Sequence, residues 1–128
     1  IRAWDVYNNL SEKRLSFEVI DNQRLVVRNL YNYPNPMNRF TRFVFEHNQS
    51  GEPLEVFIRI FTLSGRPVMK IEQQIIPTDS YAMIEWDGRD MDGNRLANGT
   101  YLYHTKVKTA HQNDSNSYEK TEKLVIIQ

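Results

Sequence analysis

Apolar and polar residues alternate along most of this chain, which is the pattern of half-buried β-strands. The alternation is clearest in residues 54–60, where the even positions are Leu54, Val56, Ile58 and Ile60. It recurs in residues 15–19, 25–27, 43–45, 101–107 and 123–128. Successive side chains of a strand point to opposite faces of a sheet, so each run predicts a strand with one apolar face. Helical spacing of apolar residues is not sustained over three turns anywhere, and we therefore predict an all-β fold.

Short turn-forming segments separate the runs, at residues 21–22, 33–36, 50–53, 64–65, 77–79, 92–94, 98–99 and 111–117. Gly65 lies in one that predicts a tight hairpin, because glycine readily takes a positive φ. Many short strands between such turns are typical of an antiparallel sandwich or barrel. The alternation assigns these residues to the core: Phe43, Phe45, Val56, Ile58, Ile60, Val68, Ile84, Trp86, Tyr101, Tyr103, Val107, Leu124 and Ile126.

A domain boundary is predicted within residues 21–29. Residues 1–21 read as one β-hairpin, and a lone hairpin is only marginally stable in water. We assign residues 1–29 to the terminal hairpin of a preceding β domain plus a linker strand, and residues 30–128 to one sandwich domain. Because the chain opens at Ile1 inside a predicted strand, we expect it to be an internal piece of a longer polypeptide. Strand exchange through the hairpin would give a homodimer.

Composition removes several classes of function. The chain has 128 residues, no cysteine, and 16 basic against 16 acidic residues. Nucleic-acid binding is not expected without a basic surplus, and cysteine-based catalysis or metal binding is excluded. The longest apolar run is too short for a transmembrane segment. The three histidines are scattered and no catalytic motif is present, so we nominate no catalytic residue and no cofactor.

The segment WDGRDMDGN offers carboxylates for a hard cation such as Ca²⁺ at Asp87, Asp90 and Asp92. The EF-hand spacing fails, because Arg95 stands at the sixth position counted from Asp90. The alternative is that the aspartates and Gly93 build consecutive turns, with carboxylates accepting local backbone N–H groups. We favour the turns over calcium.

Several aromatic residues offer a sugar-stacking platform, namely Trp4, Tyr31, Tyr33, Trp86, Tyr101 and Tyr103. The alternative is a set of core aromatics at strand spacing. Tyr101 and Tyr103 are two residues apart and so share one face, which is more often the core. We favour the core assignment.

Four segments follow one another in an order that resembles a known family: YPNPMNRFTRFVFEH, VFIRIFTLSGRPVMKI, IEWDGRDMDGNRLANGTYLYHTKV and EKLVIIQ. The series resembles the C-terminal sorting domain of proteins exported by the type IX secretion system of Bacteroidetes, and the related immunoglobulin-like domain of flagellar hook-assembly proteins. The residues that carry the motif are Tyr33, Pro34, Asn35, Pro36, Gly65, Trp86, Asp87, Gly88, Gly93, Gly99 and Tyr101. Met37 departs from the usual phenylalanine. The resemblance implies an immunoglobulin-like antiparallel β-sandwich of about seven strands.

With residues 1–21 included, the chain resembles the C-terminal region of the gingipain-type signal peptidase, or sortase, of that system. The resemblance implies a non-catalytic domain of a surface cysteine peptidase, exported through the periplasm to the outer membrane and cell surface. Its partners would be proteins of the secretion translocon or the attachment complex. Alternatives are a carbohydrate- or calcium-binding accessory sandwich, or the cleavable sorting domain of a secreted cargo protein.

Within this interpretation the last strand is the expected recognition element, at Lys123, Leu124, Val125, Ile126 and Ile127. We expect it to be an edge strand that offers unpaired amides to a partner. Pro34 and Pro36 fix φ and lack amide donors, so we expect a stiff lead into the first strand of the sandwich rather than a segment that joins a ladder.

Overall fold

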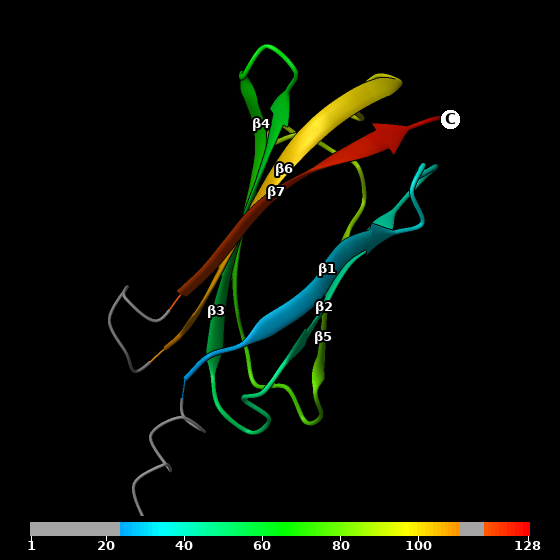
Figure 1. The fold of residues 1–128 in the computed structure, drawn as a ribbon. Coiled ribbons are helices and arrows are strands. Elements are labelled where there is room, and N and C mark those ends of the chain that lie inside the picture. The colour runs from blue at the N-terminus through cyan, green and yellow to red at the C-terminus, as the bar shows by residue number, and fades with distance from the viewer. Residues whose placement is uncertain (1–23, 111–116) are drawn as a thin grey trace, which may run out of the picture.

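The structure, a computed structural model, describes residues 24–110 and 117–128 and contains seven β-strands in two antiparallel sheets (Figure 1). In chain order the strands are β1 (Val27–Tyr33), β2 (Thr41–His47), β3 (Leu54–Thr62), β4 (Pro67–Ile75), β5 (Tyr81–Trp86), β6 (Gly99–Thr109) and β7 (Ser117–Ile126). None of the described residues is helical. The predicted all-β sandwich is therefore confirmed.

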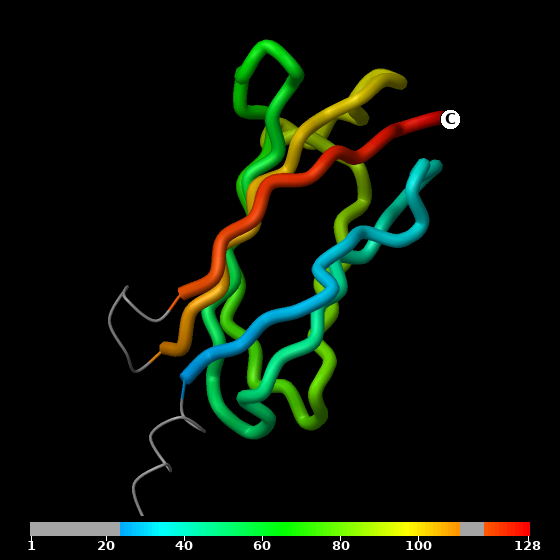
Figure 2. The backbone as a smooth tube through the Cα atoms, in the orientation of Figure 1, coloured from blue at the N-terminus to red at the C-terminus, as the bar shows by residue number. Residues whose placement is uncertain are grey.

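The two sheets are β1-β2-β5 and β4-β3-β6-β7. The chain crosses from one sheet to the other after β2, after β4 and after β5, which is the Greek-key connectivity of immunoglobulin-like sandwiches. The backbone trace shows β1 and β7 running on the same side of the molecule, one from each sheet (Figure 2). Each stands at the end of its sheet's strand order, so the first and last described strands are both edge strands.

A tight turn joins β3 to β4, as the sequence predicted. Gly65 takes φ of +93°, and its N–H donates to the carbonyl of Thr62 over 2.9 Å. An L-residue with a Cβ would be strained at that φ, although the surrounding space is open.

Strand β1 contains a bulge that interrupts its alternation. Asn29 has φ of +55°, and the register with β2 shifts between Arg28 and Tyr31. The extra residue turns Leu30 and Asn32 back to the buried face that Val27 occupies. A strict period of two therefore does not describe this strand.

The predicted core is confirmed, because every residue assigned to it is buried at 8% exposure or less. The core list from the sequence left out six buried residues: Val27 and Leu54, which lie within the predicted alternating runs, and Leu30, Met37, Ala82 and Leu96. An aromatic cluster joins the sheets. The ring centroid of Phe43 on β2 lies 4.9 Å from that of Tyr103 on β6 and 6.3 Å from that of Trp86 on β5. Burial, and then the charge of Glu122, raise the pKa of Tyr103 to about 12.

Tyr101 fixes the start of β6. Its hydroxyl donates to the backbone carbonyl of Ala97, four residues upstream, over 2.7 Å. This is the tyrosine corner of immunoglobulin-like sandwiches, in which a tyrosine near the start of the sixth strand binds the preceding connection. The bond ties the incoming loop to the sheet just before Gly99, where β6 begins.

Strand β1 begins at Val27, so residues 27–29 of the predicted linker strand belong to the same strand as residues 30–33. The sandwich therefore includes residues 27–29. The predicted hairpin of residues 1–21, and the homodimer expected to form through it, lie outside the described residues.

Candidate docking surface at the last strand

Residues 35–37 form a cap along the outer edge of β7, which we name the edge cap. The Asn35 side chain accepts the backbone N–H of Val125 over 3.0 Å and donates to the carbonyl of Lys123 over 3.4 Å. Met37 continues the pairing with its backbone: its N–H donates to the Val125 carbonyl over 2.8 Å, and its carbonyl accepts the Ile127 N–H over 2.9 Å. The edge cap therefore acts as a short parallel strand beside the last strand.

The edge cap corrects two expectations from the sequence. The amides of Val125 and Ile127 are paired, so the last strand does not offer them to a partner. The proline segment also follows the first strand instead of leading into it, because it connects β1 to β2. Pro36 cannot donate a backbone hydrogen bond, but its neighbours on both sides join the ladder, Asn35 through its side chain and Met37 through its backbone.

The two faces of the last strand differ in accessibility. Leu124 and Ile126 are 0% and 1% exposed and lie in the core. Lys123 and Ile127 are exposed and Val125 is half-buried, so these three side chains form a row on the outer face. We name this set, Lys123, Val125 and Ile127, the outer row. The five predicted recognition residues therefore divide into two anchors and three accessible side chains.

Charged residues occupy the other half of β7, which the edge cap does not reach. Lys120 and Glu122 form an ion pair at 2.8 Å, and that hydrogen bond, followed by the Glu122 charge, raises the pKa of Lys120. Glu119 contacts the ring of His104 at 3.0 Å. Charged side chains discourage pairing of an exposed edge with another strand. The apolar end of β7 is thus covered by backbone pairing, and the polar end carries charges.

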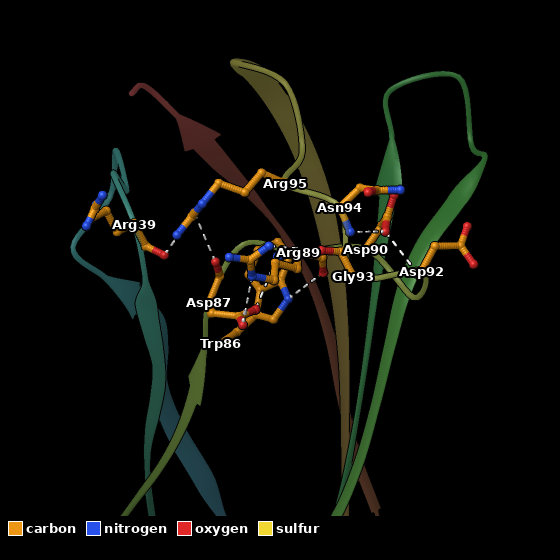
Figure 3. A network of polar contacts seen from close by, with 9 residues as sticks. All are labelled: Arg39, Trp86, Asp87, Arg89, Asp90, Asp92, Gly93, Asn94 and Arg95. Atoms are coloured by element: carbon orange, nitrogen blue, oxygen red, sulfur yellow. Dashed lines mark hydrogen bonds and ion pairs between the residues drawn. The ribbon is translucent and has the colours of Figure 1, made fainter.

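The WDGRDMDGN loop lies at the same end of the sandwich as the edge cap (Figure 3). Asp90 accepts the backbone N–H groups of Asp92 and Asn94 at 2.9 Å each, and Asp87 accepts that of Arg89 at 3.2 Å. These are the local carboxylate–amide bonds that the turn interpretation predicts. No group of three or more metal-ligating side chains gathers within residues 24–110 and 117–128. The calcium alternative predicts a melting temperature that rises with added Ca²⁺.

Trp86 and the glycines hold this loop in shape. The indole N–H of Trp86 donates to the Arg89 carbonyl over 3.0 Å, and the Arg89 guanidinium donates to the Gly93 carbonyl over 2.9 Å. Gly88 has φ of +78°, and a Cβ there would lie 3.0 Å from the terminal methyl of Met37. Glycine at position 88 therefore lets the loop pack directly on the edge cap.

Arg95 connects the loop to the segment after the edge cap. Its guanidinium donates to the carbonyls of Asp87 and Arg39 over 3.2 Å and 3.4 Å (Figure 3). Asn98, just before β6, makes the same kind of bond as Asn35. Its side-chain oxygen accepts the backbone N–H of Gln128 over 3.0 Å. The edge cap, the WDGRDMDGN loop and Asn98 therefore meet around the apolar end of β7, although the edge cap is far in the sequence from the other two.

His47 is a buried titratable group at the end of β2 that lies away from the edge cap. Its Nδ1 accepts the N–H of Gln49 over 3.0 Å, while its Nε2 is buried without a hydrogen-bond partner. Burial lowers the pKa of His47, against smaller raising effects from the Tyr81 backbone and Asp79. Burial thus favours the neutral form of this imidazole.

The predicted aromatic platform divides in the structure. Trp86, Tyr101 and Tyr103 are buried, as the core assignment expected. Tyr31 and Tyr33 are 48% and 66% exposed on the outer face of the three-stranded sheet. Trp4 lies outside the described residues.

No protein-family model and no curated protein sequence matches this chain. Among solved structures, its fold is similar to the dimeric latent form of PorU from Porphyromonas gingivalis, with a TM-score of 0.65 and 23% identity. The match covers 80% of this chain and 9% of PorU, so the chain spans less than a tenth of that protein. A second similarity is to PorZ of Porphyromonas gingivalis, an essential bacterial surface component of the type IX secretion system. It has a TM-score of 0.44 and 22% identity, and covers 77% of this chain and 11% of PorZ.

The similarity to PorU concerns the fold alone: the sandwich of this chain resembles a stretch of that protein.

Among the described residues, no helix is long and apolar enough to cross a membrane.

Proposed function

We propose that this chain is a non-catalytic docking domain of a type IX secretion protein. It serves secretion targeting and surface docking by contact with proteins of the translocon or the outer-membrane attachment complex. Two observations support the proposal: the ordered motif series of residues 33–128, and the similarity of the sandwich to a stretch of PorU. The parent protein is then a gingipain-family cysteine peptidase with a sortase role, located at the cell surface, that retains this domain.

The arrangement of the last strand carries the proposal. Two buried anchors, Leu124 and Ile126, fix β7 in the core, and the edge cap pairs its outer edge. The outer row is left accessible, with Ile127 57% exposed. An exposed aliphatic side chain held on a rigid strand is suited to contact with a protein partner.

Deleting residues 123–128 would not test this function cleanly. The deletion removes two core residues, and each large apolar side chain lost from a core costs about 2–5 kcal/mol. Folding and recognition would then fail together. Substitutions on the outer row separate the two, because they leave the anchors in place.

The test is export of the full-length parent protein carrying Val125→Asp and Ile127→Asp. We expect the protein to fold but to accumulate in the periplasm instead of reaching the cell surface. The matched control is Leu63→Asp with Ile76→Asp, since those side chains are 61% and 63% exposed at other sites. Surface display of the outer-row variant at the level of the control would refute the proposed role of β7.

A further inference from the structure

A groove crosses the outer face of the three-stranded sheet, away from the last strand. Its walls include Tyr31, Tyr33, Tyr81, Met83 and Arg42, and its volume is about 570 Å³. That volume lies within the range of about 300–1,000 Å³ that is usual for small-molecule sites. We name it the tyrosine groove.

The strand register brings the tyrosines together. Tyr31 on β1 is paired with Val44 on β2, which is paired with Met83 on β5. Tyr33 is one row away on β1, next to Arg42. Tyr81, on β5, is one row away from Tyr31 in the direction opposite to Tyr33. A strand rises about 3.3 Å per residue, and neighbouring strands lie about 4.8 Å apart. The Cα atom of Tyr31 is therefore about 7 Å from that of Tyr33 and about 12 Å from that of Tyr81.

The exposure of these rings is high for residues on a sheet. Tyr31, Tyr33 and Tyr81 are 48%, 66% and 55% exposed, and Met83 is 59% exposed. Core residues of the same strands alternate with them and are buried, so the sandwich does not need these rings for its own packing. Apolar side chains that are exposed together, unlike ones scattered singly, are typical of contact surfaces.

We propose that the tyrosine groove binds an uncharged hexose-based oligosaccharide. A sugar ring has C–H groups on its faces and hydroxyls around its edge. Tyrosine offers an apolar ring with a polar tip, so it can meet both parts of such a ligand. A second hollow of about 530 Å³ shares Tyr31, Val44 and Tyr81 with the groove, which lengthens the surface beyond one sugar ring.

The charges on the groove favour a neutral ligand. The wall carries one cation, Arg42, and one anion, Asp79. Arg42 is further neutralised by Glu85, at 3.5 Å, and its guanidinium lies 4.8 Å from the Phe40 ring centroid. The Asp79 carboxylate accepts the Tyr81 N–H over 2.9 Å. The wall therefore has a donor and an acceptor for hydroxyl groups but no excess of either charge.

A second copy of the chain is a weaker occupant. A two-fold contact whose axis passes through the groove would place one concave groove against another. The hollows would then face each other without a complementary ridge to fill them, whereas a linear oligosaccharide fills a groove. This proposal is independent of the docking role of β7.

The experiment is isothermal titration of the 128-residue chain with cellohexaose, maltohexaose, mannohexaose and chitohexaose. We expect at least one to bind with a Kd of about 1 mM or tighter. Tyr81→Ala and Tyr81→Leu should each weaken that Kd by about tenfold, because both remove the ring plane. Tyr81→Phe keeps the ring and should retain most of the affinity, and Leu63→Ala, on a distant turn, should not change it.

Three outcomes would overturn the proposal. They are the absence of binding to all four hexaoses, wild-type affinity in Tyr81→Leu, and self-association that Tyr81→Ala abolishes. The first excludes the ligand class. The second shows general apolar contact instead of ring stacking, and the third identifies the groove as an interface between copies.

Discussion

Replacing Asn35 with alanine removes both hydrogen bonds that its side chain makes to β7. One is the 3.0 Å bond from the Val125 N–H, and the other is the 3.4 Å bond to the Lys123 carbonyl. A hydrogen bond contributes about 0.5–1.5 kcal/mol net. Because both bonds lie at the surface, water can replace them, and we take the low end of that range. The expected loss is therefore about 1 kcal/mol.

The loss should be local, at the apolar end of β7. Amide hydrogen exchange followed by NMR measures it, because the Val125 N–H loses its acceptor. A loss of about 1 kcal/mol corresponds to about fivefold faster exchange of Val125. Asn35→Asp keeps an acceptor for the Val125 N–H and loses only the longer bond, so its exchange should remain close to that of the wild type.

Asn98→Ala is the matched control, since it also removes a side-chain acceptor from a backbone N–H, that of Gln128. Exchange of Val125 should be unchanged in that variant. Equal protection of Val125 in wild type and Asn35→Ala would refute the contribution of Asn35 to the edge cap. An equal increase in both alanine variants would show general fraying of the end of the chain.

Three further predictions concern stability measured by urea unfolding. Gly88→Ala should destabilise by about 1–3 kcal/mol, because it places a Cβ against Met37 at a positive φ; an unchanged midpoint would show that the loop does not pack on the edge cap. Tyr101→Phe should cost about 1 kcal/mol through the lost bond to Ala97, and wild-type stability would contradict the tyrosine corner. The pKa of His47 is lower in the folded chain than in the unfolded chain. As the pH drops below 6.5, the unfolded chain therefore binds a proton on this imidazole before the folded chain does. The free energy of unfolding should therefore fall as the pH drops below 6.5, less steeply in His47→Gln, and equal slopes would contradict the assignment.

The strands and the core could be predicted because period-two alternation is a local property. Leu54 to Ile60 and Tyr101 to Val107 alternate without interruption, and each such strand is buried on one face. The alternation failed in β1, where the bulge at Asn29 inserts one residue. Nothing in the surrounding letters distinguishes that asparagine from one in an ordinary turn.

The edge cap could not be predicted, since its partners are far apart in the chain. Asn35 and Val125 are separated by 90 positions, and their contact depends on the packing of both sheets. Composition showed only that Pro34 and Pro36 lack amide donors, which suggested a segment outside any ladder. The tyrosine groove was hidden for a similar reason, because Tyr81 reaches Tyr31 only through the strand order β1-β2-β5.

The most direct test of the docking role is site-specific photocrosslinking in living cells, with the full-length parent protein. A photoreactive residue replaces Ile127 in the outer row, which is 57% exposed, or Ile76 as the control, which is 63% exposed at the far end of the sandwich. We predict an adduct between position 127 and a protein of the translocon or attachment complex, with none from position 76. No adduct from position 127, or the same adduct from position 76, would contradict the account.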